Sequence, residues 1–222
     1  MINKLYKFRF EIFLATQVAI LFGSLFFPNH FYEHILLPLL YLISIGAGIL
    51  MISKRKKLTW FCIGLFTIAA FIFGWDMISR SENTENILIR LSIYFVFHII
   101  VTWNIIQQVW QAKRVTRKVI IGLMSGYISL GFLAFFLFTS IELMNPGSFQ
   151  GSLLGSSLIE EWTDSMLYYA YITLLTIGYG DILPTTPIAQ KAAVLVGLIG
   201  QFYLVIITAV VVEKYIRHSS KD

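Results

Sequence analysis

The sequence predicts an all-α membrane protein with six transmembrane helices and a re-entrant segment between the fifth and the sixth. Two observations lead to this fold class. Of the 222 residues, 57% are hydrophobic and only 13% are charged, which lies far outside the balance of soluble domains. The hydrophobic residues also fall into blocks about 20 residues long, and a helix of that length crosses the roughly 30 Å of hydrocarbon in a bilayer. We therefore expect the lipid bilayer to be a partner of this chain.

Short polar connections separate the six hydrophobic blocks. The blocks are residues 10–27, 35–52, 58–78, 87–110, 119–144 and 191–215. The first block could instead be a signal peptide, because Lys4, Lys7 and Arg9 precede it, but no small-residue cleavage site follows Phe27. We therefore expect this block to be retained as the first helix.

Charged residues are distributed unevenly between the two sets of helix ends. Fourteen of the 17 basic residues lie at one set, and nine of the 12 acidic residues lie at the other. Basic residues near helix ends mark the cytoplasmic side. We therefore expect a multi-pass protein of the cell membrane with both termini in the cytoplasm. The net charge of +5 reflects this orientation, and a nucleic-acid partner is not expected.

The segment between the fifth and sixth blocks must begin and end on the outer side. Residues 165–175 are apolar, and as a helix these roughly 11 residues extend about 16 Å, or half a bilayer. The next five residues, 176–180, return over a similar distance if they are extended. Backbone that is neither helix nor barrel is tolerated at this depth only when it is buried in protein or lines a water-filled path. We therefore expect the segment to line a pore.

The sequence TIGYGD, residues 176–181, resembles the selectivity filter of potassium channels, in which backbone carbonyls replace the hydration shell of K⁺. The resemblance covers about 100 residues, 119–217, which correspond to the outer helix, pore loop and inner helix of that family. It implies that K⁺ is bound at Thr176, Ile177, Gly178 and Tyr179, and that Gly180 completes the filter.

The residue types of this stretch suit such a role. Gly178 and Gly180 can adopt positive φ, which lets successive carbonyls point toward one axis. Ile177 and Tyr179 then point away from the axis, where the Tyr179 hydroxyl can hold the filter against the pore helix. A GYG tripeptide alone would more simply be a tight turn, but the apolar half-span before it favours a filter.

Residues around the filter carry further expectations from the same family. Tyr168 and Tyr169 stand where that family commonly has tryptophan in the pore helix, and a tyrosine hydroxyl can bond Asp181 behind the filter. Leu175 stands where many members have a second hydroxyl residue, which makes the inner end of the filter less polar.

The inner helix has a possible hinge and a possible gate. Gly200 lies 20 residues after Gly180, where the family often has its hinge glycine, although Gly197 is an alternative hinge. Leu204, Thr208 and Val212 follow at i+4 steps and can share one face toward a cavity. Ordinary helix packing is the alternative role of that face. Four copies of Val212 could form a hydrophobic constriction.

Residues 1–112 are expected to form a four-helix transmembrane region that resembles a degenerate voltage sensor, before a pore domain at residues 113–222. A voltage-sensing helix needs a basic residue at every third position, because one charge contributes only about 2.3 kcal/mol per 100 mV. In the fourth block, Arg90 is followed at that spacing by Ile93, Val96 and Ile99. We therefore expect opening to depend only weakly on voltage.

The resemblance implies passive K⁺ conduction by a homotetramer, since a ring of carbonyls around one axis needs several copies. The permeant ion is K⁺, and no cofactor is expected. No enzyme is expected either, because the sequence has no nucleotide-binding or metalloprotease motif. A potassium transporter subunit, a non-selective cation channel and a non-conducting membrane scaffold remain alternatives.

Overall fold

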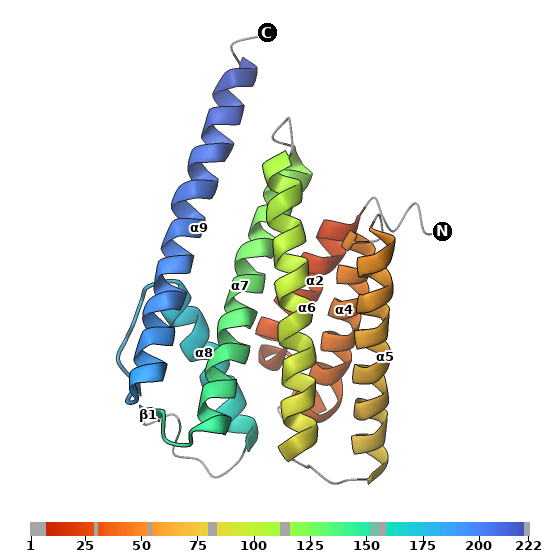
Figure 1. The fold of residues 1–222 in the computed structure, drawn as a ribbon, viewed down its shortest axis with the longest axis vertical. Helices are drawn as coiled ribbons and strands as arrows, with labels where there is room; N and C mark the ends of the chain where they lie inside the picture. The colour runs from red at the N-terminus through yellow and green to blue at the C-terminus, as the bar shows by residue number, and fades with distance from the viewer. Residues whose placement is uncertain are drawn as a thin grey trace. The chain divides into compact units, whose positions relative to one another are not determined.

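The computed structural model describes residues 8–28, 31–52, 55–79, 84–111, 116–151, 154 and 159–219. The chain divides into two compact units, Met1–Gly126 and Tyr127–Asp222. Helix α7 (Arg117–Met144) contributes residues to both units. Figure 1 shows that long helices dominate the described part of each unit.

The first unit is built from helices that pack side by side. They are α2 (Arg9–Phe22), α4 (Leu37–Ile52), α5 (Lys56–Ser79) and α6 (Thr84–Gln111). Helix α4 lies against each of the other three. Close packing of α4 and α6 needs Gly48, because an added Cβ would overlap the ring of Phe97. A hydrogen bond of 3.2 Å from Arg9 Nη2 to Gln108 Oε1 also joins α2 to α6.

The first predicted helix, residues 10–27, is wrong at its C-terminal end. Helix α2 stops at Phe22, and a 3-10 turn, η1 (Gly23–Leu25), follows. A π-helical turn, η2 (Tyr32–Leu36), then leads into α4. The Tyr32 hydroxyl donates to Ile20 O, the carbonyl that a continuing α-helix would bond to the amide of Ser24. The Tyr32 ring lies against Gly23, where an added Cβ would overlap it.

The second unit begins within α7 and contains two short strands and two further helices. These are β1 (Phe149–Gly151), α8 (Ile159–Leu174), β2 (Ile182–Pro184) and α9 (Pro187–Ser219). Helix α8 lies beside α7 and α9 over only part of their length, and the segment after it returns to the end where α9 begins (Figure 1).

Two helices of the second unit start earlier than the hydropathy of the sequence predicts. The half-span expected at residues 165–175 is the longer helix α8, which ends at Leu174. Its early residues include acidic side chains, which lower the hydropathy but are favourable near the positive end of a helix dipole. Helix α9 begins at Pro187 and not at residue 191. The Thr186 hydroxyl accepts the amide of Ala189 at 3.4 Å, so Thr186 and Pro187 form a common pair of helix-start residues.

The strands β1 and β2 were not expected from the sequence. They pair antiparallel, with Phe149 opposite Pro184 and Gly151 opposite Ile182. Gly151 allows this close approach, because an added Cβ would overlap the carbonyl of Asp181. The pair therefore joins the loop after α7 to the residues that follow the TIGYGD sequence.

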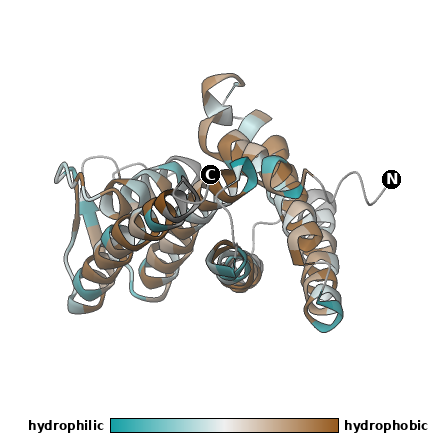
Figure 2. Ribbon diagram, turned by 90° about the horizontal axis from the view of Figure 1, so that it is seen from above, coloured by the Kyte–Doolittle hydropathy of each residue, from teal (hydrophilic) through white to brown (hydrophobic). Residues whose placement is uncertain are grey.

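In the described part of the chain, three helices are long and apolar enough to cross a membrane. They are Leu91–Gln111, Arg117–Met144 and Pro187–Glu213, and Leu37–Ile52 is a shorter apolar helix. Hydrophobic residues make up most of the helical ribbon in Figure 2. The chain is thus a mostly helical membrane protein. Several basic residues used to predict its orientation, including Lys4, Lys54 and Lys113, lie outside the described residues, as does the side chain of Arg90.

Candidate functional site

Two tyrosine hydroxyls join helices α7 and α8, one from each helix, and each donates to a backbone carbonyl of the other helix. Tyr171 Oη, on α8, donates to Ile128 O at 2.7 Å. Tyr127 Oη, on α7, donates to Leu174 O, the last carbonyl of α8, at 3.3 Å. Gly131 lies beneath the Tyr171 ring, and an added Cβ there would overlap the ring. These contacts fix the point at which the chain leaves α8.

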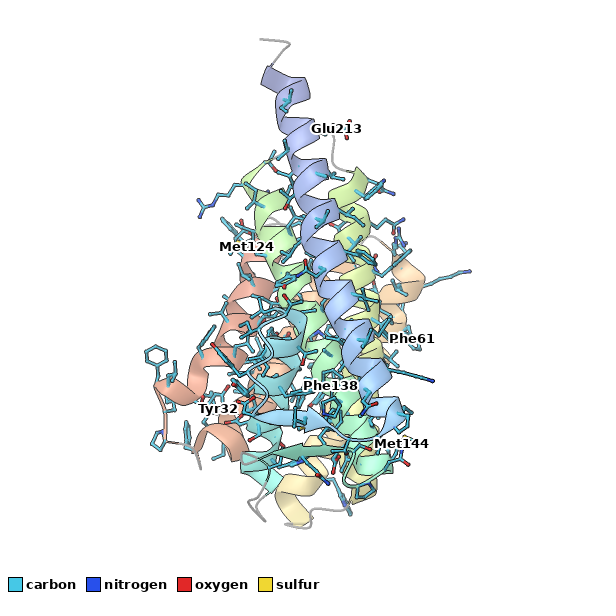
Figure 3. The ribbon with its side chains drawn as sticks, turned by 90° about the vertical axis from the view of Figure 1, so that its left-hand side faces the viewer. Tyr32, Phe61, Met124, Phe138, Met144 and Glu213 are labelled. Carbon is cyan, nitrogen blue, oxygen red and sulfur yellow. The ribbon has the colours of Figure 1, made fainter. Side chains whose placement is uncertain are left out.

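An aromatic cluster holds the middle of α8 in place. The rings of Phe138, Phe149 and Tyr169 have centroids 5.0 to 5.5 Å apart and come from α7, β1 and α8. Phe138 can be located on α7 in Figure 3. The Tyr169 hydroxyl bonds the side chain of Thr173. Of the two tyrosines expected to support the filter, Tyr169 therefore packs in this cluster and does not bond Asp181.

The residues after α8 turn back on its last carbonyls. Ile172 O accepts the amides of Ile177, at 2.8 Å, and of Gly178, at 3.4 Å. Thr173 O accepts the amide of Thr176 at 3.0 Å. The C-terminal end of α8, which carries the negative end of the helix dipole, therefore lies against the first residues of the TIGYGD sequence.

Positive φ angles alternate along the TIGYGD sequence. They are +57° at Thr176, +59° at Gly178 and +81° at Gly180. The flexibility of glycine was expected to be used here, but the conformation of Thr176 was not. Thr176 is the one non-glycine residue with positive φ in the described part of the chain. A β-branched residue in this region is an outlier that costs about 1–3 kcal/mol.

The backbone carbonyl groups of residues 176–179 accept no hydrogen bond from the described part of the chain. The side chains of Ile177 and Tyr179 are 47% and 71% exposed in the single chain. The expected hydrogen bond from the Tyr179 hydroxyl to α8 is not formed within the described chain. Four consecutive carbonyls are thus available to an external ligand.

Asp181, the last residue of the TIGYGD sequence, is held by two hydrogen bonds. Tyr168 Oη donates to Asp181 Oδ2 at 2.5 Å, and the amide of Ile182 donates to Asp181 Oδ1 at 3.1 Å. Tyr168 is therefore the tyrosine that contacts Asp181. Because Tyr168 lies on α8, this bond links α8 to the last residue of the TIGYGD sequence through side chains.

Replacing Tyr168 with phenylalanine should weaken the attachment of Asp181 to α8. Asp181 loses a charge-assisted hydrogen bond, and we expect ion flux through reconstituted protein to decay about twofold faster or more during sustained activity. Replacing Tyr169 with phenylalanine removes a hydroxyl that does not contact Asp181 and should leave the decay unchanged. Equal decay rates in the two variants and in the wild type, measured in liposomes, would contradict this role for Tyr168.

A carboxylate that the sequence analysis did not single out orders the loop after α7. Glu142 Oε1 accepts the amide of Gly147 at 2.7 Å, and its Oε2 accepts the amide of Phe149 at 3.0 Å. The loop is joined to the residues after β2 by a bond of 2.7 Å from Thr185 Oγ1 to Gly147 O. Sequence spacing gives no sign of these contacts, because the partners come from different segments.

Two adjacent residues of helix α9 contact the end of α8 and the first residue of the TIGYGD sequence. At Gly200, an added Cβ would overlap Leu174 O and come within 3.1 Å of the Leu174 carbonyl carbon. Next to it, Gln201 Nε2 donates to Thr176 Oγ1 at 3.0 Å. Gly197, the alternative hinge, has no atom closer than Thr173 O at 3.9 Å from an added Cβ. Gly200 is therefore a contact glycine within a continuous helix, and Gln201 is a residue that sequence reasoning missed.

The predicted gate residues lie on the same side of α9 as Gln201. At about 100° per residue, Thr208 and Val212 fall within roughly 20° of the direction of Gln201, and Leu204 within roughly 60°. All three are exposed in the single chain. Exposure alone does not distinguish them from their neighbours, but the bond from Gln201 to Thr176 gives the direction. Glu213, one residue on, lies toward the opposite end of the unit from Met144 (Figure 3).

Comparison with known proteins gives one family match. Residues 123–217 match a family model described as "Ion channel". The matched stretch runs from α7 through the strands and α8 into α9. No curated protein and no solved structure matches the chain. The family match supports an ion channel, and it covers all the residues of the candidate site.

Proposed function

We propose that this chain forms a potassium-selective channel, in which K⁺ passes through a homotetrameric pore lined by residues 176–180. The observation that carries the proposal is the alternation of positive φ at Thr176, Gly178 and Gly180. The four carbonyls of residues 176–179, which accept no hydrogen bond from the described part of the chain, add to it. Uncharged oxygen ligands suit a monovalent cation that must bind and then leave. The family match supports an ion channel, and the TIGYGD sequence supports K⁺ as the ion.

The exposure of α9 supports assembly of several copies. In the apolar stretch of α9, 17% of the residues are buried in the single chain, whereas 56% are buried in the apolar stretch of α7. Lipid can cover part of this surface. A closed ring of identical subunits also covers part of it, and only such a ring surrounds an axis with carbonyls. In the tetramer, the exposed side chains of Ile177 and Tyr179 would pack against neighbouring copies.

We further propose that all six long helices cross the cell membrane, with both termini in the cytoplasm. Helix α2 has 14 residues and is followed by the three residues of η1, which together extend roughly 27 Å. This length is close to the thickness of the hydrocarbon layer. Residues 1–112 then form the four-helix region, and residues 113–222 form the pore domain.

Ion flux in liposomes tests the proposed function. Purified protein should pass K⁺ at channel rates, should pass little Na⁺, and should be blocked by Ba²⁺. Slow, saturable K⁺ uptake would indicate a transporter subunit, equal K⁺ and Na⁺ flux would indicate a non-selective channel, and no flux would indicate a scaffold. Native mass spectrometry of the same sample should give a tetramer, and a monomer in a conducting sample would contradict the proposed assembly.

Replacing Val212 with aspartate should raise the resting K⁺ flux. Four valines that converge at one level of the pore exclude water, whereas a carboxylate retains water and attracts cations. The matched control is Val210, which lies about 180° from Gln201 around α9 and is half-buried. Aspartate at residue 210 should reduce assembly without raising flux. If the two variants behave alike in thallium uptake, the narrowest point does not lie at Val212.

A further inference from the structure

A side-chain hydrogen bond connects α9 to the base of the proposed filter. Gln201 Nε2 lies 3.0 Å from Thr176 Oγ1, and Thr176 Oγ1 lies 2.7 Å from Leu175 O. A hydroxyl has one proton and two lone pairs. Because the Thr176 proton is donated to Leu175 O, the amide of Gln201 must be the donor to Thr176. One lone pair of the hydroxyl oxygen then remains for a cation.

Thr176 needs to be held in place, because its positive φ of +57° is unfavourable for a β-branched residue. Its amide bonds Thr173 O at 3.0 Å and its hydroxyl bonds Leu175 O. Both of these acceptors belong to the same stretch of chain. Among the described residues, Gln201 is the partner of Thr176 that comes from a different element.

The contact depends on how closely α9 approaches α8. Gly200 lies against the carbonyl of Leu174, where a side chain would not fit, and this places Gln201 within reach of Thr176. The bond is 3.0 Å long, and a separation beyond about 3.5 Å no longer forms a good hydrogen bond. A displacement of α9 by roughly half an ångström along this direction would therefore release Thr176.

We propose that Gln201 is a positioning residue for the innermost K⁺ site, and that it couples the position of α9 to the conformation of Thr176. This inference rests on the proposed channel function. When Gln201 donates to Thr176, the hydroxyl oxygen is fixed with a lone pair toward the ion path. When α9 moves away, Thr176 loses this restraint and its strained backbone can relax. The inner end of the filter thus responds to the position of the helix that carries Leu204, Thr208 and Val212.

A double-mutant cycle in reconstituted protein tests this coupling. Replacing Gln201 with leucine removes the donor at similar size, and we expect K⁺ flux to fall about two- to tenfold, together with the preference for K⁺ over Na⁺. Replacing Thr176 with valine removes the hydroxyl and keeps the shape. In the Thr176→Val background, Gln201→Leu should have almost no further effect, whereas in the Thr176→Ser background it should keep its full effect.

Two further variants complete the test. Gln201→Asn keeps an amide but is one methylene too short to reach Thr176, so it should lose the same coupling as Gln201→Leu. It takes the place of Gln201→Leu in the cycle if the leucine variant does not assemble. Thr208→Val removes a hydroxyl from the same side of α9 without touching Thr176. Its effect on flux should multiply with that of Thr176→Val and show no coupling.

The outcomes separate the coupling from the channel function itself. If the wild-type protein passes K⁺, and the effect of the double variant on flux differs at least about threefold from the product of the two single effects, the coupling is supported. If the wild-type protein passes K⁺ and the effects of the substitutions at residues 201 and 176 simply multiply, the coupling is overturned and the channel function stays in place. Wild-type protein that passes no K⁺ overturns the channel function, and the coupling with it.

Discussion

Replacing Gly178 with alanine should reduce K⁺ flux by at least about tenfold, because a residue with a Cβ resists the left-handed conformation by about 1–2 kcal/mol in each subunit of the proposed tetramer. Gly178 has φ of +59°, and no atom lies within 4 Å of an added Cβ. Within the single chain, the effect therefore comes from the backbone conformation. Relaxation toward negative φ turns a carbonyl away from the ion path. Thallium or K⁺ flux in liposomes measures the loss.

A matched control separates this effect from general destabilisation. Gly147 lies in the loop between α7 and β1 with φ of +84°, and an added Cβ there also meets no atom within 4 Å. Alanine at residue 147 imposes a similar local strain far along the chain from the filter. The tetramer should be destabilised slightly and K⁺ flux should be retained. Wild-type flux and selectivity in Gly178→Ala would remove the basis for assigning the filter to these residues.

Replacing Gly200 with alanine should destabilise the tetramer and abolish most K⁺ flux. The added Cβ overlaps Leu174 O, a backbone atom that α8 and Tyr127 hold in place. Helix α9 must then move away from α8. Overpacking of this kind costs about 1–3 kcal/mol per site, and the displacement also breaks the bond from Gln201 to Thr176. Thermal melting of the tetramer in detergent and K⁺ flux in liposomes measure the two effects.

The same comparison at Gly197 distinguishes packing from bending. At Gly197 the nearest atom to an added Cβ is 3.9 Å away, an ordinary contact distance, so Gly197→Ala should keep the thermal stability of the tetramer. If Gly200 serves as a hinge and not as a packing site, Gly200→Ala should melt like the wild type and lose only channel opening. A loss of opening confined to Gly197→Ala would place the bend at Gly197.

Hydropathy and residue type predict much of the helical framework of this chain. Each of the six hydrophobic blocks contains a helix, because a run of about 20 apolar residues has few alternatives to a helix in a bilayer. The alternation of positive φ at Gly178 and Gly180 also follows from the sequence, since glycine is the residue that adopts it readily. These features depend on residues that are close together in the chain, so they can be predicted from a single sequence.

Contacts between distant segments were not predictable in this way. The end of α2 at Phe22 depends on a hydroxyl ten residues later, at Tyr32. The strained φ of Thr176 depends on α8 before it and on Gln201 from α9. The sequence predicts Gly200 as a hinge, with Gly197 as the alternative, and gives no sign of the Leu174 carbonyl against which Gly200 packs. In each case the deciding partner is set by tertiary packing, which local pattern does not specify.

The reversal potential of the wild-type channel, with K⁺ on one side of a planar bilayer and Na⁺ on the other, tests the central claim most directly. Purified protein should give currents whose reversal potential follows the K⁺ gradient and does not respond when Na⁺ is replaced by a large organic cation. Ba²⁺ should block these currents. Two results would contradict potassium-selective conduction through residues 176–180. One is a reversal potential near zero with equal concentrations of K⁺ and Na⁺ on opposite sides, and the other is the absence of current when the tetramer is present.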